Sequence, residues 1–65
     1  MKIQTEYIKL DSLMKLISWV DSGGMAKTVI ANGEVRVNGE VETRRGRKLY
    51  PGDSVQWEDL CETIE

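Results

Sequence analysis

The sequence predicts an α+β fold in which two consecutive helices cover a small antiparallel sheet. Three observations lead to this prediction. A short stretch near the start of the chain alternates in character from residue to residue, as a strand does. Two adjoining segments, residues 11–20 and 22–32, then carry apolar residues at helical spacing. Turn signals divide the remaining chain, so the expected order is strand, helix, helix and three short strands.

The first strand is predicted over residues 3–7, where Ile3, Thr5 and Tyr7 alternate with charged or amide side chains. The first helix follows from about residue 11 to residue 20, with Asp11 or Ser12 as its N-cap. Its buried face should consist of the apolar residues that share one wide side of the helix: Leu13, Met14, Leu16, Ile17 and Val20.

The second helix is predicted to begin after Ser22, a good N-cap residue, and to end near Asn32. Gly33 supplies the left-handed residue that commonly stops a helix. The connection between the two helices is very short, so they must pack against each other at an angle. Residues at helical spacing give the buried face of this helix: Met25, Ala26, Val29 and Ile30.

Asn38-Gly39 is a strong hairpin signal after a strand that contains Val35 and Val37. A two-residue loop would place Val37 opposite Glu40 and mix apolar with charged partners. A three-residue loop would place Val37 opposite Val41 and Arg36 opposite Glu42. Because the second register keeps one face apolar and pairs opposite charges, it is the one that we expect, with Glu40 and Glu42 in solvent.

A turn at Pro51-Gly52 leads to the last predicted strand, which contains Val55 and Trp57. We expect residues 1–65 to form one domain and residues 58–65 to be an acidic, partly frayed tail. A tail that screens the basic residues is the alternative. Its acidic residues are Glu58, Asp59, Glu62 and Glu65.

Charge is unevenly distributed along the chain, which has nine Lys and Arg residues against eleven Asp and Glu residues. Four of the five residues from Arg44 to Lys48 are nevertheless basic. A local basic cluster on an acidic protein indicates a polyanionic partner, although a solvated loop would show the same composition. Arginine and lysine suit phosphate oxygens, and the basic side chains are Arg44, Arg45, Arg47 and Lys48.

The start of the second helix is a further candidate. Ser22-Gly23-Gly24 would expose backbone N–H groups at the positive end of the helix dipole, with Lys27 one turn on. A tight turn that needs glycine only for its conformation is an equally good interpretation. Trp19 and Trp57 are expected to be core or rim residues rather than stacking platforms, which favours recognition of folded RNA over single strands.

Catalytic and metal-binding patterns are missing from the sequence. The chain has no histidine and a single cysteine, Cys61, which excludes a Cys/His nucleophile and a Cys/His zinc site. We therefore expect a protein that is not an enzyme and that uses no cofactor and no metal. No apolar run approaches the length of a membrane span, and the first residues lack a signal peptide's apolar block. A cytoplasmic protein without a membrane partner is expected.

Several of these motifs together resemble the S-four RNA-binding domain, which is named for ribosomal small-subunit protein four. The segments that carry the resemblance are Lys9-Leu-Asp-x-Leu13, Ser22-x-x-x-Ala26-Lys27, Ile30-x-x-Gly33-x-Val35-x-Val37-Asn38-Gly39 and Lys48-x-x-x-Gly52-Asp53-x-Val55. The chain is similar in particular to the small free-standing bacterial YaaA/YbcJ type, through Ser22-Gly23-Gly24 and Gly39-Glu-Val-Glu-Thr-Arg-Arg45.

The resemblance implies an αL motif, in which two helices and the adjoining hairpin present a basic surface to structured RNA. It carries the family's RNA contacts to Lys9, Lys15, Lys27, Arg36, Arg44, Arg45, Arg47 and Lys48. The chain departs from the family pattern at Gly23-Gly24, where many members have an arginine, and at Lys9, which replaces an arginine. The leading hypothesis is thus a monomeric, non-catalytic module that binds ribosomal RNA or a ribosome assembly intermediate, with the large ribosomal subunit as a possible partner.

The competing hypothesis is a small protein-interaction adaptor with a β-grasp-like fold and no RNA ligand, which Val35-Arg-Val-Asn-Gly39 superficially suits. A sulfur carrier of that fold would need a C-terminal Gly-Gly, whereas this sequence ends in Glu62-Thr-Ile-Glu65. The ending argues against a carrier and leaves the adaptor open.

Overall fold

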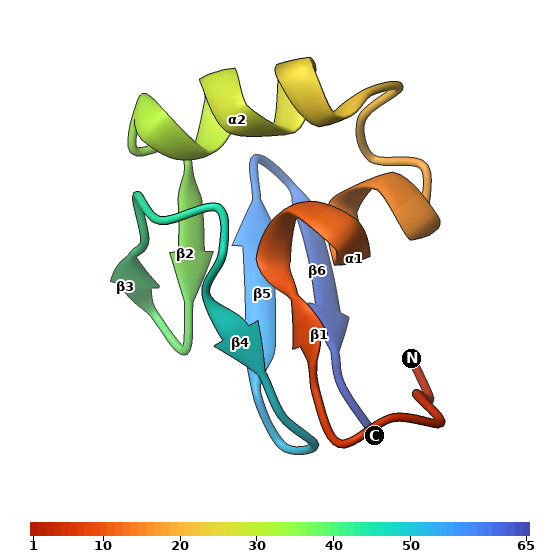
Figure 1. The fold of residues 1–65 in the computed structure, drawn as a ribbon. Coiled ribbons are helices and arrows are strands. Elements are labelled where there is room, and N and C mark those ends of the chain that lie inside the picture. Colours follow the sequence, from red (N-terminus) through yellow and green to blue (C-terminus); the bar gives the residue numbers. More distant parts are fainter.

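Two helices and six short strands make up the computed structural model, which describes residues 1–65 (Figure 1). The α+β prediction is confirmed, and all four strand pairings are antiparallel. Four strands form one sheet in the order β3-β2-β5-β6, and β1 and β4 form a separate two-stranded ladder. The elements are β1 (Ile8–Lys9), α1 (Leu10–Leu16), α2 (Gly23–Ala31), β2 (Val35–Val37), β3 (Glu40–Val41), β4 (Lys48–Leu49), β5 (Ser54–Trp57) and β6 (Leu60–Thr63).

The first strand is displaced from its predicted position. Residues 3–7 do not form a strand, and β1 comprises only Ile8 and Lys9, which pair with Leu49 and Lys48 of β4. The partner strand lies far away in the sequence, so local alternation could not locate this pairing. Ile3 instead packs, partly buried, against the core.

Helix α1 is shorter than predicted. It ends at Leu16 rather than near Val20, because Ser18 adopts a left-handed conformation (φ 63°). The N–H groups of Trp19 and Val20 then both donate to the Met14 carbonyl, at 2.9 and 3.3 Å, which closes a turn after the helix. Leu16, predicted to be buried, is 63% exposed, whereas Leu10, Leu13, Met14 and Val20 lie in the core.

Helix α2 follows the prediction closely. The Ser22 side chain accepts a hydrogen bond from the Met25 N–H at 3.2 Å, so Ser22 is the N-cap. Gly33 has a φ of 77° just after the helix, as a left-handed stop requires. The face of α2 that enters the core carries Ala26, Val29 and Ile30, while Met25 is exposed.

The hairpin between β2 and β3 has a different register from the predicted one. Val37 lies opposite Glu40 and Arg36 lies opposite Val41, so the loop contains only Asn38 and Gly39. Both loop residues have positive φ, 53° and 85°, as a type I′ turn requires. The twist of that turn matches the twist of paired strands, and this preference outweighs the charge pairing that favoured a longer loop.

The acidic C-terminal segment is not a frayed tail. Residues 60–63 form β6, which pairs along β5 at the edge of the sheet, and Ile64 is only 1% exposed. The amino group of Met1 contacts the carboxylates of Glu62 and Glu65 at 2.7 and 3.6 Å. The carboxylates of Glu62 and Glu65 therefore lie beside the start of the chain, near where Figure 1 shows both termini, whereas Glu58 and Asp59 occupy the turn between β5 and β6. None of the four makes an ion pair with residues 44–48.

One hydrophobic core lies between the helices and the sheet. Val35, Val37, Val55 and Trp57 contribute from the strands, with Leu49 from β4. Arg36 and Gln56, which alternate with these residues, point to the opposite, solvent-exposed face of the sheet. The turn at Pro51-Gly52 is confirmed, since the Asp53 N–H donates to the Tyr50 carbonyl at 2.9 Å and Gly52 has a φ of 101°.

Candidate nucleic-acid interface

The loop of residues 42–48 is tied to the start of α1 by backbone hydrogen bonds. The N–H of Leu10 donates to the Arg47 carbonyl at 2.9 Å, and the N–H of Asp11 donates to the Arg45 carbonyl at 3.1 Å. The first N–H groups of a helix have no partner within the helix, and Lys9 provides no side-chain cap here. The loop carbonyls satisfy these donors, so the helix and the basic loop hold each other in place.

A buried carboxylate organises the arginines of this loop. Glu42 is 6% exposed, and its N–H donates to the Val35 carbonyl at 2.9 Å, which continues the hairpin pairing. The observed register places the Glu42 side chain on the same face as Val35 and Val37, toward the core. The expectation that Glu42 is a solvated hairpin residue is therefore wrong, and its cause is the one-residue difference in register.

Glu42 accepts four hydrogen bonds from two arginines, and each bond has good geometry. The backbone N–H, Nε and Nη2 of Arg44 donate at 3.0, 2.9 and 3.0 Å, and Nη1 of Arg47 donates at 2.8 Å. The hydrogen bonds from the Arg44 side chain, followed by the one from Arg47, lower the pKa of Glu42 to about 2 against the opposing effect of burial. Glu42 stays ionised in all but strong acid.

Both arginines still present donors to solvent. The Arg44 side chain is 73% exposed although it contacts Glu42 along one edge, and the Arg47 side chain is partly exposed. A guanidinium has N–H groups on more than one edge, so an arginine held by a carboxylate can also bind a phosphate. Glu42 reduces the net charge of the loop but fixes the direction in which Arg44 and Arg47 point.

Two lysines add to this region through the β1–β4 ladder, where Lys9 lies directly opposite Lys48. Like charges at opposite positions of an antiparallel pair destabilise it. The Lys48 ammonium lies 4.9 Å from the centroid of the Tyr7 ring, a cation–π contact that offsets part of this cost. A bound anion would offset the rest.

We call this group the basic surface and define it as Lys9, Arg44, Arg45, Arg47 and Lys48. A shallow pocket in it is lined by Arg44, Gly46, Arg47 and Lys48. A Cβ atom added to Gly46 would meet nothing within 4 Å, so the glycine leaves the floor of the loop open to an approaching ligand.

The remaining predicted site residues lie elsewhere. Figure 1 shows the start of α2 at the far end of that helix from the 42–48 loop, so Ser22–Gly24 is not part of the basic surface. Lys15 lies in the last turn of α1 and Lys27 lies in α2, so these two lysines are on the two helices that the segment before α2 connects. Arg36 points to the outer face of the sheet, where its Nη1 donates to the Gly39 carbonyl at 3.4 Å. The structure thus gathers five of the predicted residues and separates the others.

The glycines at the start of α2 are not required by conformation. Neither Gly23 nor Gly24 has a left-handed φ. A Cβ atom at Gly23 would meet nothing within 4 Å, and one at Gly24 would lie 3.8 Å from the Ser22 hydroxyl. The interpretation of a tight turn that needs glycine for its shape loses its support, because a side chain at Gly23 would meet only open space.

The aromatic residues divide into two pairs. Trp19 and Trp57 lie 6.4 Å apart, and both pack in or against the core, as predicted. Tyr7 and Tyr50 form a second pair at 5.9 Å beside the basic surface. Neither tyrosine is predicted from the sequence to be a site residue. Their position depends on the β1–β4 ladder, which no local pattern indicated.

Chemically, the region offers fixed cationic donors and no reactive group. No three residues among His, Cys, Asp and Glu are arranged to hold a metal ion. Neither helix has the length and apolar character that crossing a membrane demands.

Comparison with known proteins gives concordant matches. A family model described as S4 domain matches residues 1–65. The chain is 52% identical over 56 residues to the "Probable ribosome maturation protein RlbA" of Bacillus subtilis (strain 168), a match that covers 86% of this chain and 79% of that protein. It is 43% identical over 51 residues to the "Putative RNA-binding protein YbcJ" of Escherichia coli (strain K12), covering 78% of this chain and 73% of that protein.

Proposed function

The chain belongs to the S4 domain family, and from this membership we propose that it is a non-catalytic module that binds structured RNA through the basic surface. The observation that carries the proposal is the convergence of Lys9 from β1 and Lys48 from β4 with the arginines that Glu42 orients. A folded RNA holds its phosphates in fixed positions, and cationic donors that are also held in fixed positions suit such a ligand.

The RNA is proposed to be ribosomal RNA or a ribosome assembly intermediate. One similar protein is named for ribosome maturation and another for RNA binding, and together they motivate this choice. The large ribosomal subunit is the proposed destination, and the protein would act there as a monomer in the cytoplasm.

Ser22–Gly24, Lys15 and Lys27 form a proposed second contact region. The N–H groups of Gly23 and Gly24, which precede the Met25 N–H that Ser22 caps, suit a phosphate, and Lys27 lies one turn further along the helix. The molecule is at most 27 Å long, so one folded RNA is large enough to contact both regions. Arg36 falls outside both, because it points to the outer face of the sheet.

A salt titration of binding to ribosomal RNA fragments tests the proposal. If about four phosphates are neutralised, the logarithm of the affinity should fall against the logarithm of the salt concentration with a slope of about −3. A slope near zero would contradict binding through phosphates. Competition with other folded RNAs then tests whether the ribosomal fragment is preferred.

Two exposed arginines allow a matched comparison of the two faces. Arg45→Glu reverses a charge on the basic surface, and Arg36→Glu reverses one on the outer face of the sheet. We expect Arg45→Glu to weaken binding to many RNAs alike, because phosphate contacts position an RNA without reading its sequence. Arg36→Glu should have a much smaller effect. Equal effects would show that overall charge, not this surface, governs binding.

A further inference from the structure

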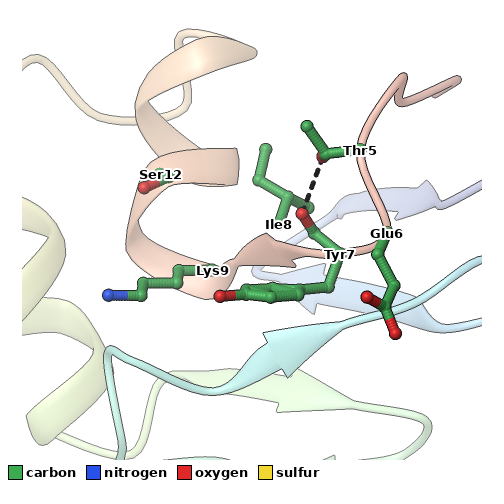
Figure 2. Close-up of a pocket in the computed structure, with 6 residues that line it drawn as sticks. All are labelled: Thr5, Glu6, Tyr7, Ile8, Lys9 and Ser12. Atoms are coloured by element: carbon green, nitrogen blue, oxygen red, sulfur yellow. Dashed lines mark hydrogen bonds between the residues drawn. The ribbon is translucent and has the colours of Figure 1, made fainter.

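A second pocket adjoins the basic surface at its lysine pair. It is lined by Thr5, Glu6, Tyr7, Ile8, Lys9 and Ser12. Figure 2 shows the Tyr7 ring between Lys9, at its hydroxyl end, and Glu6 at its other end, with Ser12 standing on the first turn of α1. The pocket thus combines an aromatic ring, an aliphatic side chain, hydroxyl groups and one cation.

The Tyr7 ring is held in a fixed orientation. Tyr50 packs against it at 5.9 Å with the two rings inclined by 49°, and the Lys48 ammonium lies 4.9 Å from its centroid. The Thr5 hydroxyl donates to the Tyr7 carbonyl at 2.8 Å, which fixes the backbone. Tyr7 is half-buried, and it lines the pocket whereas Lys48 and Tyr50 do not. A rigid ring that opens on a pocket is a platform for a flat, aromatic ligand.

The charges around the pocket favour a base over a phosphate inside it. Glu6 contributes a carboxylate to the lining, which would repel a phosphate. Lys9 lines the same pocket and lies opposite Lys48, which lines the pocket of the basic surface. A nucleotide with its phosphate at this lysine pair could therefore place its base against the Tyr7 ring.

We infer that this pocket receives one unstacked base of the bound RNA, from a bulge or a loop, and stacks it on Tyr7 while Lys9 and Lys48 hold the adjoining phosphate. The inference rests on the proposed RNA-binding function and goes further, since it adds recognition of an unpaired nucleotide to contacts with phosphates. Folded RNAs commonly present such splayed bases, and aromatic side chains are their usual partners.

The test compares two RNA hairpins of one sequence, with and without a single bulged nucleotide, by fluorescence anisotropy at fixed salt. The wild-type protein should bind the bulged hairpin about tenfold more tightly. Tyr7→Leu should abolish this preference, so that the variant binds the two hairpins equally, while Tyr7→Phe, which retains the ring, should preserve it. Tyr50→Leu is the matched control, because it disrupts the same ring pair without altering the pocket lining.

Each outcome bears on the inference separately from the proposed function. Equal binding of both hairpins by the wild-type protein would overturn the inference and leave RNA binding intact, whereas failure to bind either would refute both. A preference lost equally in Tyr50→Leu and Tyr7→Leu would assign the effect to packing and overturn the stacking role. If Tyr7→Leu does not fold, the wild-type protein can be tested with an RNA that carries 5-iodocytidine at the bulged position. The photocrosslink should map to Tyr7, and a crosslink confined to other residues would overturn the inference.

Discussion

Glu42 and Arg44, two residues apart after the hairpin, form a paired contact in which Nε and Nη2 of the arginine donate to the two carboxylate oxygens at 2.9 and 3.0 Å. One partner is buried and the other projects into solvent. The contact therefore connects the core to the basic surface, and the orientation of a proposed RNA-binding side chain depends on a residue that no RNA would touch.

The first prediction concerns the contribution of Glu42 to stability. Glu42→Gln removes the charge that Arg44 and Arg47 face but retains the size of the side chain. We expect the free energy of unfolding to fall by about 2 kcal/mol, because the ionised hydrogen bonds are lost while the burial cost remains. Urea denaturation measures this change. Glu40→Gln, on the exposed strand of the same hairpin, should stay within about 0.5 kcal/mol of wild type; a comparable loss in both variants would contradict a special role for Glu42.

The second prediction concerns acid. A carboxyl group whose pKa is lower in the folded than in the unfolded protein stabilises the fold above its ordinary pKa, and this stabilisation disappears as pH falls through the folded value. For Glu42 the window lies between 4.5 and about 2. The pKa of Asp53 is also lowered, chiefly by the hydrogen bond from the Tyr50 backbone N–H, so it contributes in the same direction. Thermal melts from pH 7 to pH 2 should show falling stability.

Comparing the wild-type protein with Glu42→Gln distinguishes the contribution of Glu42 to the pH dependence of stability from that of Asp53. The variant lacks the Glu42 titration, so the difference in stability between wild type and variant should shrink across this pH window. A difference that stays constant from pH 7 to pH 2 would show that the Glu42 pKa is ordinary in the folded protein.

The features that the sequence predicts correctly depend on interactions between near neighbours in the chain. Ser22, Gly33 and Pro51-Gly52 act through their nearest neighbours, and each was placed correctly. The hairpin loop was recognised at Asn38-Gly39, but its register was wrong because pairing of Arg36 with Glu42 was weighted above the twist preference of the turn. That single error hid the burial of Glu42.

Long-range pairing accounts for the other differences. Strand β1 pairs with β4 across most of the chain, and the segment containing β6 looked like an acidic tail because Ile64 alone reveals its buried character. The sequence accordingly predicted which basic residues belong to the candidate site, but not how the fold arranges them on one surface. The Lys9–Lys48 pair and the Tyr7 contact depend on a ladder whose partners are distant in sequence.

The third prediction separates stability from binding at Lys9. Lys9→Gln removes one of two like charges that oppose each other across the β1–β4 ladder, so the free energy of unfolding should stay equal or rise by about 0.3 kcal/mol. RNA affinity should fall several-fold, and the slope of the salt titration should become shallower by about 0.75, a quarter of the slope expected for four phosphates. Lys2→Gln removes the same charge next to Met1, whose amino group pairs with Glu62 and Glu65 and not with the loop, and should leave the slope unchanged. An unchanged slope in Lys9→Gln would exclude Lys9 from the phosphate contacts.

The last prediction concerns Gly23, whose added Cβ atom would meet only open space. Gly23→Ala should raise the free energy of unfolding by about 0.5 kcal/mol, because alanine loses less backbone entropy when it joins a helix. If a phosphate approaches the first N–H groups of α2, the same methyl group obstructs it, and RNA affinity should fall although the protein is more stable. Gly33→Ala provides the opposite case, since its φ of 77° makes the substitution strained and should cost about 1 kcal/mol. A more stable Gly23→Ala variant with unaltered RNA affinity would confine binding to the basic surface and remove the start of α2 from the interface.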